Sequence, residues 1–253
     1  MPEIILKTEG LTKMYRGACA VDHVATEIYR GDIYGFIGVN GAGKTTFMKM
    51  VCGLTAPGEG SMALFGASCG KPLRMARRKI GALIEHPAFY PNMTALENLE
   101  VQRRYLDMEP GKNHRQAMQE LLEQVGLADT GRKRAGAFSL GMKQRLGLAI
   151  ALIGNPELLI LDEPTIGLDP VGVVELRALL VQLNRERNLT IFFSSHNLSE
   201  MERLATRYGF LHRGKLVREL TARQLEEDCQ SRGIDLEGYF LNLLTEGKTG
   251  VRS

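Results

Sequence analysis

The sequence has no tryptophan, few aromatic residues and no long apolar run. Phe, Trp and Tyr together make up 6% of its 253 residues. No stretch approaches the roughly 20 consecutive apolar residues that a membrane-spanning helix needs. If the chain works at a membrane, we therefore expect another polypeptide to span it.

Cysteine is also scarce, and its spacing argues against two kinds of site. The 4 cysteines, Cys19, Cys52, Cys69 and Cys229, are widely separated and form no Cys-x-x-Cys pair. Such spacing favours neither a disulfide framework nor a structural zinc site. Reduced thiols of a cytosolic protein are the expected state.

An excess of charge of one sign is absent as well. The chain has 32 basic and 29 acidic residues, a net charge of +3, which is too balanced to indicate a nucleic-acid partner. One basic stretch runs from Lys71 to Lys79, and we interpret it as the solvated face of a helix. With 44% hydrophobic residues, the composition suits one large globular domain or two small ones.

What the chain does have is a glycine-rich stretch, Gly38 to Thr45, in the pattern of a phosphate-binding loop. An apolar run of strand length precedes it, and apolar residues at helical spacing follow it. Glycines let backbone N–H groups converge on phosphate oxygens, and the start of the helix adds a favourable dipole. The ammonium of Lys44 would lie between the β- and γ-phosphates, and the hydroxyl of Thr45 would join a Mg²⁺ shell. The candidate triphosphate-binding residues of this stretch are Gly38, Asn40, Gly41, Gly43, Lys44, Thr45 and Thr46.

A second apolar run, residues 158–161, ends in two adjacent carboxylates, Asp162 and Glu163. Neighbouring side chains of a strand point to opposite faces, so the two acids can serve different tasks. We predict that Asp162 holds Mg²⁺ through its water shell. Glu163 is then the residue that orients and polarises the water attacking the γ-phosphate.

The order of apolar runs and helical patterns predicts an α/β fold. Continuous apolar runs at residues 33–37, 80–84, 158–161 and 189–193 are separated by helical segments, which indicates a parallel sheet covered on both faces. Residues 3–9 and about 20–29 are expected as strands joined by a loop at 11–17, and residues 207–218 as a terminal hairpin. The pattern from Thr94 to Ala128 is helical and breaks at Pro110 and Gly111, so we place an inserted helical subdomain at about 87–155.

Two further residues allow both a structural and a functional interpretation. Ser139 is a good N-cap for the helix that follows it, and a serine cap with free N–H groups can also bind an anion. On physical grounds alone, a capped core helix is the simpler account. Tyr15 could stack on an adenine ring, although an aromatic residue at a strand end more often serves packing.

Together these motifs resemble the nucleotide-binding subunit of ATP-binding cassette (ABC) transporters. In that family a Ser–Gly signature, here Ser139 and Gly141, follows the helical subdomain and precedes the Asp–Glu strand. Asp169 matches the family's loop after that strand, and His196 matches the switch histidine after the next strand. Tyr15 matches the adenine-stacking aromatic residue.

The resemblance covers residues 1 to about 220 and implies a P-loop NTPase (RecA-like) core. An N-terminal antiparallel β subdomain and the inserted α-helical subdomain would complete this domain, and residues 221–253 would be a short C-terminal extension. The ligands implied are ATP and Mg²⁺, and the partners implied are integral membrane permease subunits at the cytoplasmic face of the membrane. Two copies would face each other head to tail. Ser139 and Gly141 would then contact the γ-phosphate bound to the second copy, while His196 would hold the γ-phosphate and the attacking water of its own copy. Asp169 is a further candidate for ATP binding.

Two departures from the family pattern indicate a narrower function for this chain. Leu140 stands where a first glycine is usual and Met142 where glutamine is usual, but the backbone N–H groups that bind phosphate remain. Glu85 replaces the glutamine that contacts the Mg²⁺ site, and a carboxylate binds a hard cation more strongly. Both departures resemble the subgroup that exports bacitracin and lantibiotics.

We therefore predict an ATPase that powers export of an antimicrobial peptide through separate permease subunits. Another cargo, such as ions, lipids or drugs, stays open because the membrane subunit selects the cargo. A cassette protein acting on ribosomes or DNA is disfavoured by the single phosphate loop, the lack of a heptad arm and the balanced charge. Residues 86 to about 105 would meet the permease. Phe89, Tyr90 and Met93 are candidates for that contact, but they equally suit the core of the subdomain.

Overall fold

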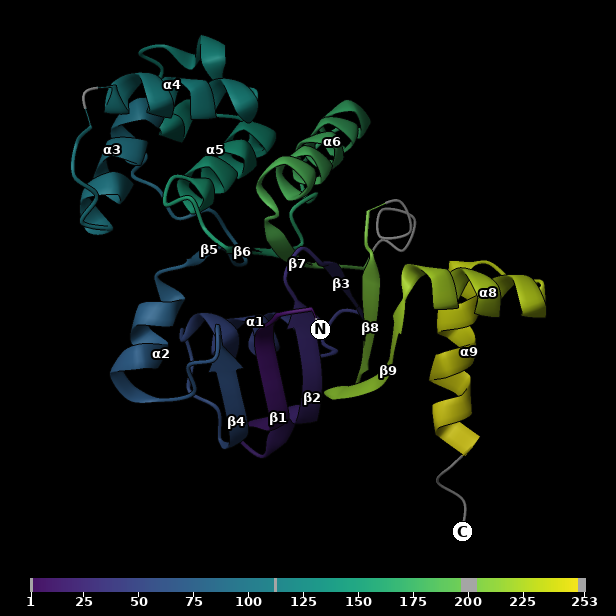
Figure 1. Ribbon diagram of the computed structural model, residues 1–253. Coiled ribbons are helices and arrows are strands. Elements are labelled where there is room, and N and C mark those ends of the chain that lie inside the picture. Colours follow the sequence, from purple (N-terminus) through teal and green to yellow (C-terminus); the bar gives the residue numbers. More distant parts are fainter. Residues whose placement is uncertain (1, 112, 197–203, 250–253) are drawn as a thin grey trace.

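A six-stranded sheet forms the centre of the fold (Figure 1). The computed structural model describes residues 2–111, 113–196 and 204–249. The strands lie in the order β5-β6-β7-β3-β8-β9, and all neighbours are parallel except β9, which is antiparallel to β8. Their bounds are Ile33–Ile37 (β3), Ile80–Leu83 (β5), Leu158–Asp162 (β6), Thr190–Ser195 (β7), Arg207–His212 (β8) and Lys215–Thr221 (β9).

The central strands β3, β6 and β7 are buried at every residue. This is the expected state of a parallel sheet that is covered on both faces, and it explains why these strands are continuous apolar runs. The predicted parallel core is therefore confirmed. The hairpin predicted at residues 207–218 is confirmed as well, since it corresponds to β8 and β9.

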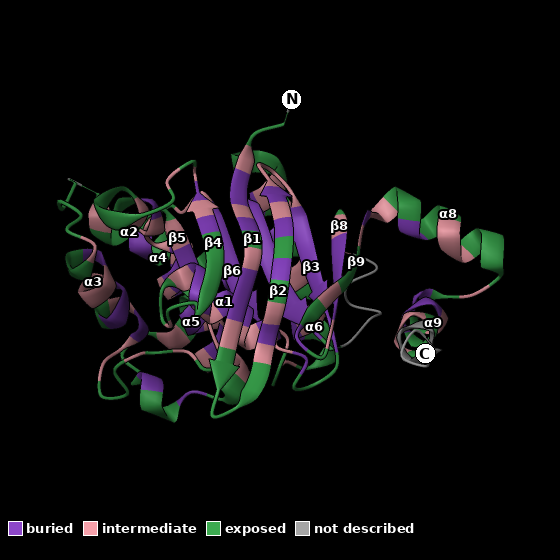
Figure 2. Ribbon diagram, turned by 90° about the horizontal axis from the view of Figure 1, so that it is seen from below, coloured by how far each residue is buried: buried purple, intermediate pink, exposed green. Residues whose placement is uncertain are grey.

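A second, antiparallel sheet has the order β2-β1-β4, with bounds Ile4–Tyr15 (β1), Ala18–Tyr29 (β2) and Glu59–Leu64 (β4). The prediction of a loop at 11–17 is wrong, because β1 continues to Tyr15. Gly10, at φ +60°, lies where the register shifts between Thr8 and Leu11. After this bulge the ladder resumes with Leu11 opposite Val24. Figure 2 shows buried bands alternating with more exposed ones along β2, as expected for a sheet with one face on the core.

Helix α1, Lys44–Cys52, packs in a core that both sheets share. Phe47 of α1 contacts Phe36 and Phe192 of the parallel sheet, with ring centroids 5.3 and 6.0 Å away. Such aromatic contacts add to the stability gained from burial itself. They fix the helix that begins immediately after the glycine-rich stretch.

Helices cover both faces of the parallel sheet. Leu158 and Ile160 of β6 belong to the cluster that contains α1, whereas Leu159 and Leu161 belong to a cluster with α5 and α6. The other helices have the bounds Gly70–Arg77 (α2), Ala95–Tyr105 (α3), His114–Gln124 (α4), Leu140–Leu152 (α5), Pro170–Arg187 (α6), Ala222–Arg232 (α8) and Leu236–Thr249 (α9). Within the described ranges, every helix is too short or too polar to cross a lipid bilayer.

Helices α3, α4 and α5 follow one another between β5 and β6 and lie on the side of the parallel sheet opposite the antiparallel sheet (Figure 1). Thr94 and Glu97 form a capping box at the start of α3. The predicted break at Pro110 and Gly111 separates α3 from α4, as expected. The subdomain bounds of 87–155 and the division of the chain at residue 220 stay predictions.

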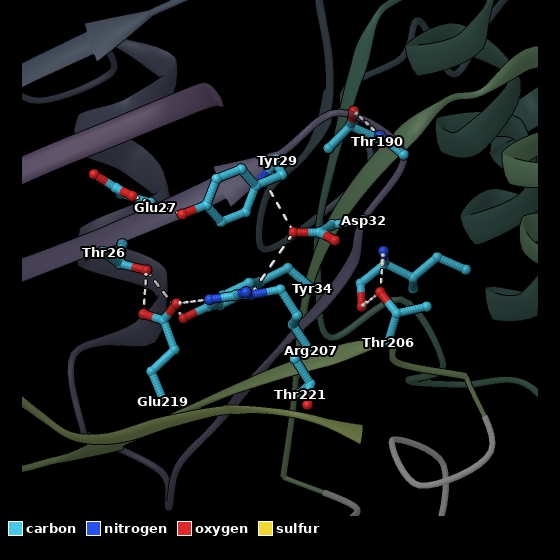
Figure 3. A network of polar contacts seen from close by, with 12 residues as sticks. Thr26, Glu27, Tyr29, Asp32, Tyr34, Thr190, Thr206, Arg207, Glu219 and Thr221 are labelled. Atoms are coloured by element: carbon cyan, nitrogen blue, oxygen red, sulfur yellow. Dashed lines mark hydrogen bonds and ion pairs between the residues drawn. The ribbon is translucent and has the colours of Figure 1, made fainter. Parts of the chain in front are cut away.

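A polar network fastens the β8–β9 hairpin to β2 and β3 (Figure 3). Nη2 of Arg207 donates to Glu219 at 2.6 Å, and the hydroxyl of Thr26 donates to the other oxygen of Glu219 at 2.8 Å. The guanidinium of Arg207 also lies 5.0 Å from the ring centre of Tyr29, and its Nε lies 3.8 Å from Asp32. Burial raises the pKa of the Asp32 carboxyl above its usual range. The network holds the hairpin in a fixed place beside β3.

Candidate functional site

The glycine-rich stretch forms a tight turn between β3 and α1. Gly41 and Gly43 have φ values of +80° and +108°, which favour glycine. A Cβ at Gly43 would lie 2.2 Å from the carbonyl oxygen of Ala20, and one at Gly38 would lie 2.7 Å from that of Leu211. The turn therefore packs backbone against backbone. The first N–H groups of α1 have no carbonyl partner within the helix, so they are suited to bind phosphate oxygens.

The remaining candidates of this stretch differ in exposure. Asn40 is exposed, and Thr46 lies half-buried in the first turn of α1. Lys44 is only 5% exposed, and its ammonium donates to the carbonyl oxygen of Gly38 at 2.6 Å. The same ammonium lies 3.3 Å from Oε1 of Glu163. A triphosphate offers oxygens that can replace both contacts, because a lysine ammonium binds phosphate as a point charge.

Thr45, Asp162 and Ser194 form a chain of hydrogen bonds. The hydroxyl of Thr45 donates to Oδ2 of Asp162 at 2.8 Å, and the hydroxyl of Ser194 donates to Oδ1 at 2.6 Å. Mg²⁺ takes hard oxygen ligands and usually binds through one or two protein groups together with substrate phosphates. Among the residues that the structure describes, no group of three or more His, Cys, Asp and Glu side chains could hold a metal ion. Thr45 and Asp162 therefore fit a Mg²⁺ ion that binds together with a triphosphate.

Glu163 lies directly after β6, at φ +52°. Its Oε1 faces Lys44, and its Oε2 lies 2.8 Å from Nδ1 of His196. Its backbone N–H donates to the hydroxyl of Ser194 at 3.0 Å. The structure thus brings Lys44, Glu163 and His196 together. Asp162 and Glu163 have different partners, but strand alternation does not set this difference, because β6 ends at Asp162 and Glu163 has a positive φ.

Tyr15 ends β1 and is 45% exposed. The hairpin of β1 and β2 reaches the phosphate loop, since Ala20 of β2 lies against Gly43. The ammonium of Lys13 lies 5.3 Å from the ring centre of Tyr15. The ring is therefore a surface residue rather than part of the core. Its contact with adenine stays a prediction.

Ser139, Gly141 and Asp169 form a second group, at the start of α5 and α6. Ser139 caps α5 by accepting the N–H of Met142 at 3.3 Å, and Asp169 caps α6 by accepting the N–H of Gly172 at 2.8 Å. The predicted N-cap at Ser139 is thus confirmed. Binding of a second copy's phosphate by this group stays a prediction.

Glu85 follows β5 at φ +59° and contacts α1. Its Oε1 accepts a hydrogen bond from the ammonium of Lys49 at 2.7 Å, and its side chain is 55% exposed. Lys49 lies one turn of helix after Thr45. The carboxylate is therefore held beside the helix that carries Thr45, and its contact with Mg²⁺ stays a prediction.

A groove of about 770 Å³ lies between α2, the segment after β5, and helices α3 and α5. Arg74, Arg77 and Arg78 line one side, and Tyr105 is 79% exposed on the other. Lys71, Arg74, Arg78 and Lys79 are exposed, as the prediction of a solvated face expects, and Arg77 is half-buried. Arg77 donates to the carbonyl oxygen of Val51 at 3.3 Å and so stabilises the end of α1.

The three residues after β5 that are candidates for contact with the permease differ in exposure. Phe89 is partly buried and packs against the main core, whereas Tyr90 is 56% exposed and Met93 is half-buried. Core packing therefore accounts for Phe89, and Tyr90 is left as a surface residue.

Sequence reasoning missed Ser194. Its signal is a hydroxyl in a strand whose preceding residues, 191–193, are all apolar. The role of Ser194 depends on the register between β6 and β7, which places Ser194 opposite Asp162. The hydroxyl then serves both Asp162 and the backbone of Glu163.

Comparisons with known proteins agree with this geometry. The sequence profile of the ABC transporter family matches residues 21–166. The bacitracin transport ATP-binding protein BcrA of Bacillus licheniformis is 49% identical over 223 residues, covering 88% of this chain and 72% of that protein. The lantibiotic transport ATP-binding protein SrtF of Streptococcus pyogenes is 42% identical over 215 residues, covering 85% of this chain and 90% of that protein.

Among solved structures, an ATP-binding cassette dimer in a post-hydrolysis state with ADP and phosphate superposes with a TM-score of 0.77. It is 26% identical, and the match covers 86% of this chain and 99% of that one. The predicted P-loop NTPase fold and the predicted likeness to the bacitracin and lantibiotic subgroup are confirmed. The chain therefore belongs to the ABC transporter family and is an ATP-binding, ATP-hydrolysing subunit of such a transporter.

Proposed function

We propose that this ATPase powers the export of an antimicrobial peptide of the bacitracin or lantibiotic type, through separate permease subunits. The observation that carries the proposal is the similarity, over most of the chain, to two transport ATPases named for these peptides. Glu85 and the signature variant at Leu140 support the same subgroup. The chain itself is peripheral, held at the cytoplasmic face of the membrane by the permease.

In the proposed mechanism, Lys44 and the N–H groups of the phosphate loop bind the β- and γ-phosphates of ATP. Thr45 and Asp162 would hold Mg²⁺, which would supply charge neutralisation at the phosphate oxygens when bound. Glu163 orients and polarises the attacking water. The water oxygen bonds to the γ-phosphorus as the bond to the β–γ bridging oxygen breaks, and the carboxylate of Glu163 accepts the proton that the water loses, which gives ADP and phosphate. His196, which lies 2.8 Å from Glu163, holds the γ-phosphate and the water from the same side.

A second copy completes each ATP site in this proposal. Ser139 and Gly141, at the start of α5, contact the γ-phosphate bound to the other copy, and Asp169 lies beside them. Tyr15 stacks on the adenine. A dimeric relative of the same fold supports this arrangement.

Replacing Glu163 tests the catalytic part. Glu163→Gln should abolish ATP turnover and leave ATP binding intact, because the amide keeps the shape of the side chain but cannot accept a proton. Glu186→Gln is a matched control, since Glu186 is an exposed carboxylate on α6. Undiminished hydrolysis in the Glu163 variant would remove this residue from the role of activating water.

The permease is proposed to dock in the groove lined by Arg74, Arg77 and Arg78. Among the described residues that line this groove, none is acidic. Arg78 is already paired with Asp107 at 2.6 Å, so Arg74 is the arginine proposed to face a carboxylate of the permease. The variant Arg74→Glu should lose co-purification with the permease and keep ATPase activity in the isolated chain. Lys71→Glu is the control, because Lys71 is on the same helix but not in the groove. Equal retention of the permease by both variants would contradict this docking site.

The cargo is tested in the cell. Deleting the gene should raise sensitivity to bacitracin or to a lantibiotic, and the wild-type gene, but not the Glu163→Gln variant, should restore resistance. Unchanged sensitivity to both peptide classes would reject the cargo and leave the ATPase function standing.

A further inference from the structure

The start of α5 is packed directly on the loop that precedes α6. Gly167 of this loop has φ +82°, and a Cβ added there would lie 2.3 Å from Cδ2 of Leu140. A Cβ added at Gly141 would lie 3.3 Å from Cδ2 of Leu168. The two segments therefore touch at two successive positions, with the side chain of Leu140 lying over the bare backbone of Gly167.

A second bridge lies little more than one turn further along α5. Nη2 of Arg145 donates to Glu175 of α6 at 2.6 Å, and Nη1 donates to the carbonyl oxygen of Val125 at 3.0 Å. The guanidinium also lies 3.3 Å from the position of a Cβ on Gly172, whose N–H is capped by Asp169. Because α5 meets the start of α6 at both points, its orientation relative to this segment is fixed.

We infer that Leu140 is a positioning residue, which sets the distance between the signature group (Ser139 and Gly141) and Asp169. The inference rests on the proposed function, in which these groups face the ATP of a second copy. In this role the side chain of Leu140 acts through the loop of Gly167 and Leu168 and not through contact with that ATP. It holds the loop of Gly167 and Leu168 against α5, so that both parts of the dimer-facing surface move as one unit.

The residue type at position 140 supports this role. Leu140 is an apolar side chain that is 55% exposed in the single chain, and its contact with Gly167 is made by the end of the side chain. A glycine at position 140, usual in the family, could not make this contact. Gly167 is matched to it, because a side chain there would displace the end of the Leu140 side chain and because its φ of +82° favours glycine.

The first experiment measures ATP-driven dimerisation in a Glu163→Gln background, where bound ATP is not consumed. Leu140→Ala is expected to raise the dimer dissociation constant about fivefold, as judged by sedimentation, because half of a leucine contact is lost. Leu140→Met should stay within about twofold, since methionine can cover the same backbone. Binding of a fluorescent ATP analogue to the monomer should be unchanged in both variants, because Leu140 lies outside the phosphate loop.

The second experiment tests the contact itself. The amide of Leu168 donates to the carbonyl oxygen of Thr165 at 3.1 Å, and its hydrogen exchange should be faster in Leu140→Ala. Gly167→Ala should weaken dimerisation strongly, and adding Leu140→Ala should restore part of the loss by removing the collision.

The outcomes distinguish failure of the proposed head-to-tail ATP site from failure of the role assigned to Leu140. If the Glu163→Gln parent does not dimerise with ATP, the head-to-tail site is wrong, and the inference is rejected with it. If the parent dimerises and Leu140→Ala changes neither dimerisation nor the exchange of Leu168, the inference alone is overturned. Additive losses in the double variant with Gly167→Ala would overturn it as well.

Discussion

Ser194 offers a sharp test of how the strand ends organise the site. Its side chain is fully buried, donates to Asp162 at 2.6 Å and accepts the N–H of Glu163 at 3.0 Å. Ser194→Ala removes both hydrogen bonds without adding bulk. A bond to a charged group contributes about 1.5–3 kcal/mol, and leaving one more buried group unpaired costs about 1 kcal/mol or more, so the loss of stability should be about 2–4 kcal/mol.

The same change should lower turnover more than it lowers affinity for ATP. Asp162 loses the bond that orients one of its oxygens, and the backbone that carries Glu163 loses its anchor. We expect kcat to fall at least about tenfold, since a small displacement of a catalytic group is costly. Urea unfolding gives the stability, and steady-state kinetics separate kcat from KM.

Thr190→Val provides the control. Thr190 is also fully buried on β7, and its hydroxyl accepts the N–H of Gly31 at 3.0 Å, at the opposite end of the strand. This variant should lose about 1 kcal/mol of stability and keep its kcat, because it removes the hydroxyl that accepts the half-buried N–H of Gly31, far from the acids. If Ser194→Ala loses less than about 1 kcal/mol and turns over normally, the hydroxyl does not organise the two acids.

Three further predictions concern other contacts. Glu85→Gln should change stability by at most about 0.5 kcal/mol in urea unfolding, because its ion pair is exposed; a larger loss would mean that this pair holds α1 and the segment after β5 together. The two cations beside Glu157 hold the pKa of its carboxyl below the usual value of 4.5, so its stabilising effect is present above pH 4.5 and is lost as the pH falls through the lowered pKa. Unfolding experiments from pH 7 to pH 3 should therefore show the wild-type advantage over Glu157→Gln, about 0.5–1 kcal/mol, shrinking with acid; a constant difference would contradict this reasoning. Gly43→Ala should abolish ATP binding, because the new Cβ meets the carbonyl of Ala20 at 2.2 Å, whereas Gly41→Ala, with open space around its Cβ, should bind ATP more weakly but measurably in a fluorescence titration.

The parts of the site that could be predicted from the sequence are those in which neighbouring residues work together. Gly38 to Thr45 and the pair Asp162 and Glu163 lie in short stretches that residue type and spacing alone mark as candidates. The N-cap at Ser139 follows from the same kind of local rule.

The parts that could not be predicted depend on contacts between distant segments. Ser194 acts through the register of β6 and β7, which no local pattern encodes. The end of β1 was missed because the bulge at Gly10 resets the alternation of buried and exposed residues, so the segment to Tyr15 no longer reads as a strand. Arg77 is part of a basic stretch in the sequence, but its role is set by carbonyl groups at the end of α1.

The position of β3 determines when, during synthesis of the chain, the nucleotide site can form. This strand lies between β7 and β8, so Ile33 pairs with Ile191 and Tyr34 with Arg207. The phosphate loop itself is held by the hairpin, since the N–H of Gly214 donates to the carbonyl oxygen of Ala42 at 2.9 Å. Synthesis delivers the loop early and its neighbours last. A chain still emerging from the ribosome therefore carries the complete phosphate-loop sequence without a nucleotide site, and it gains that site only when residues near 214 are free to fold.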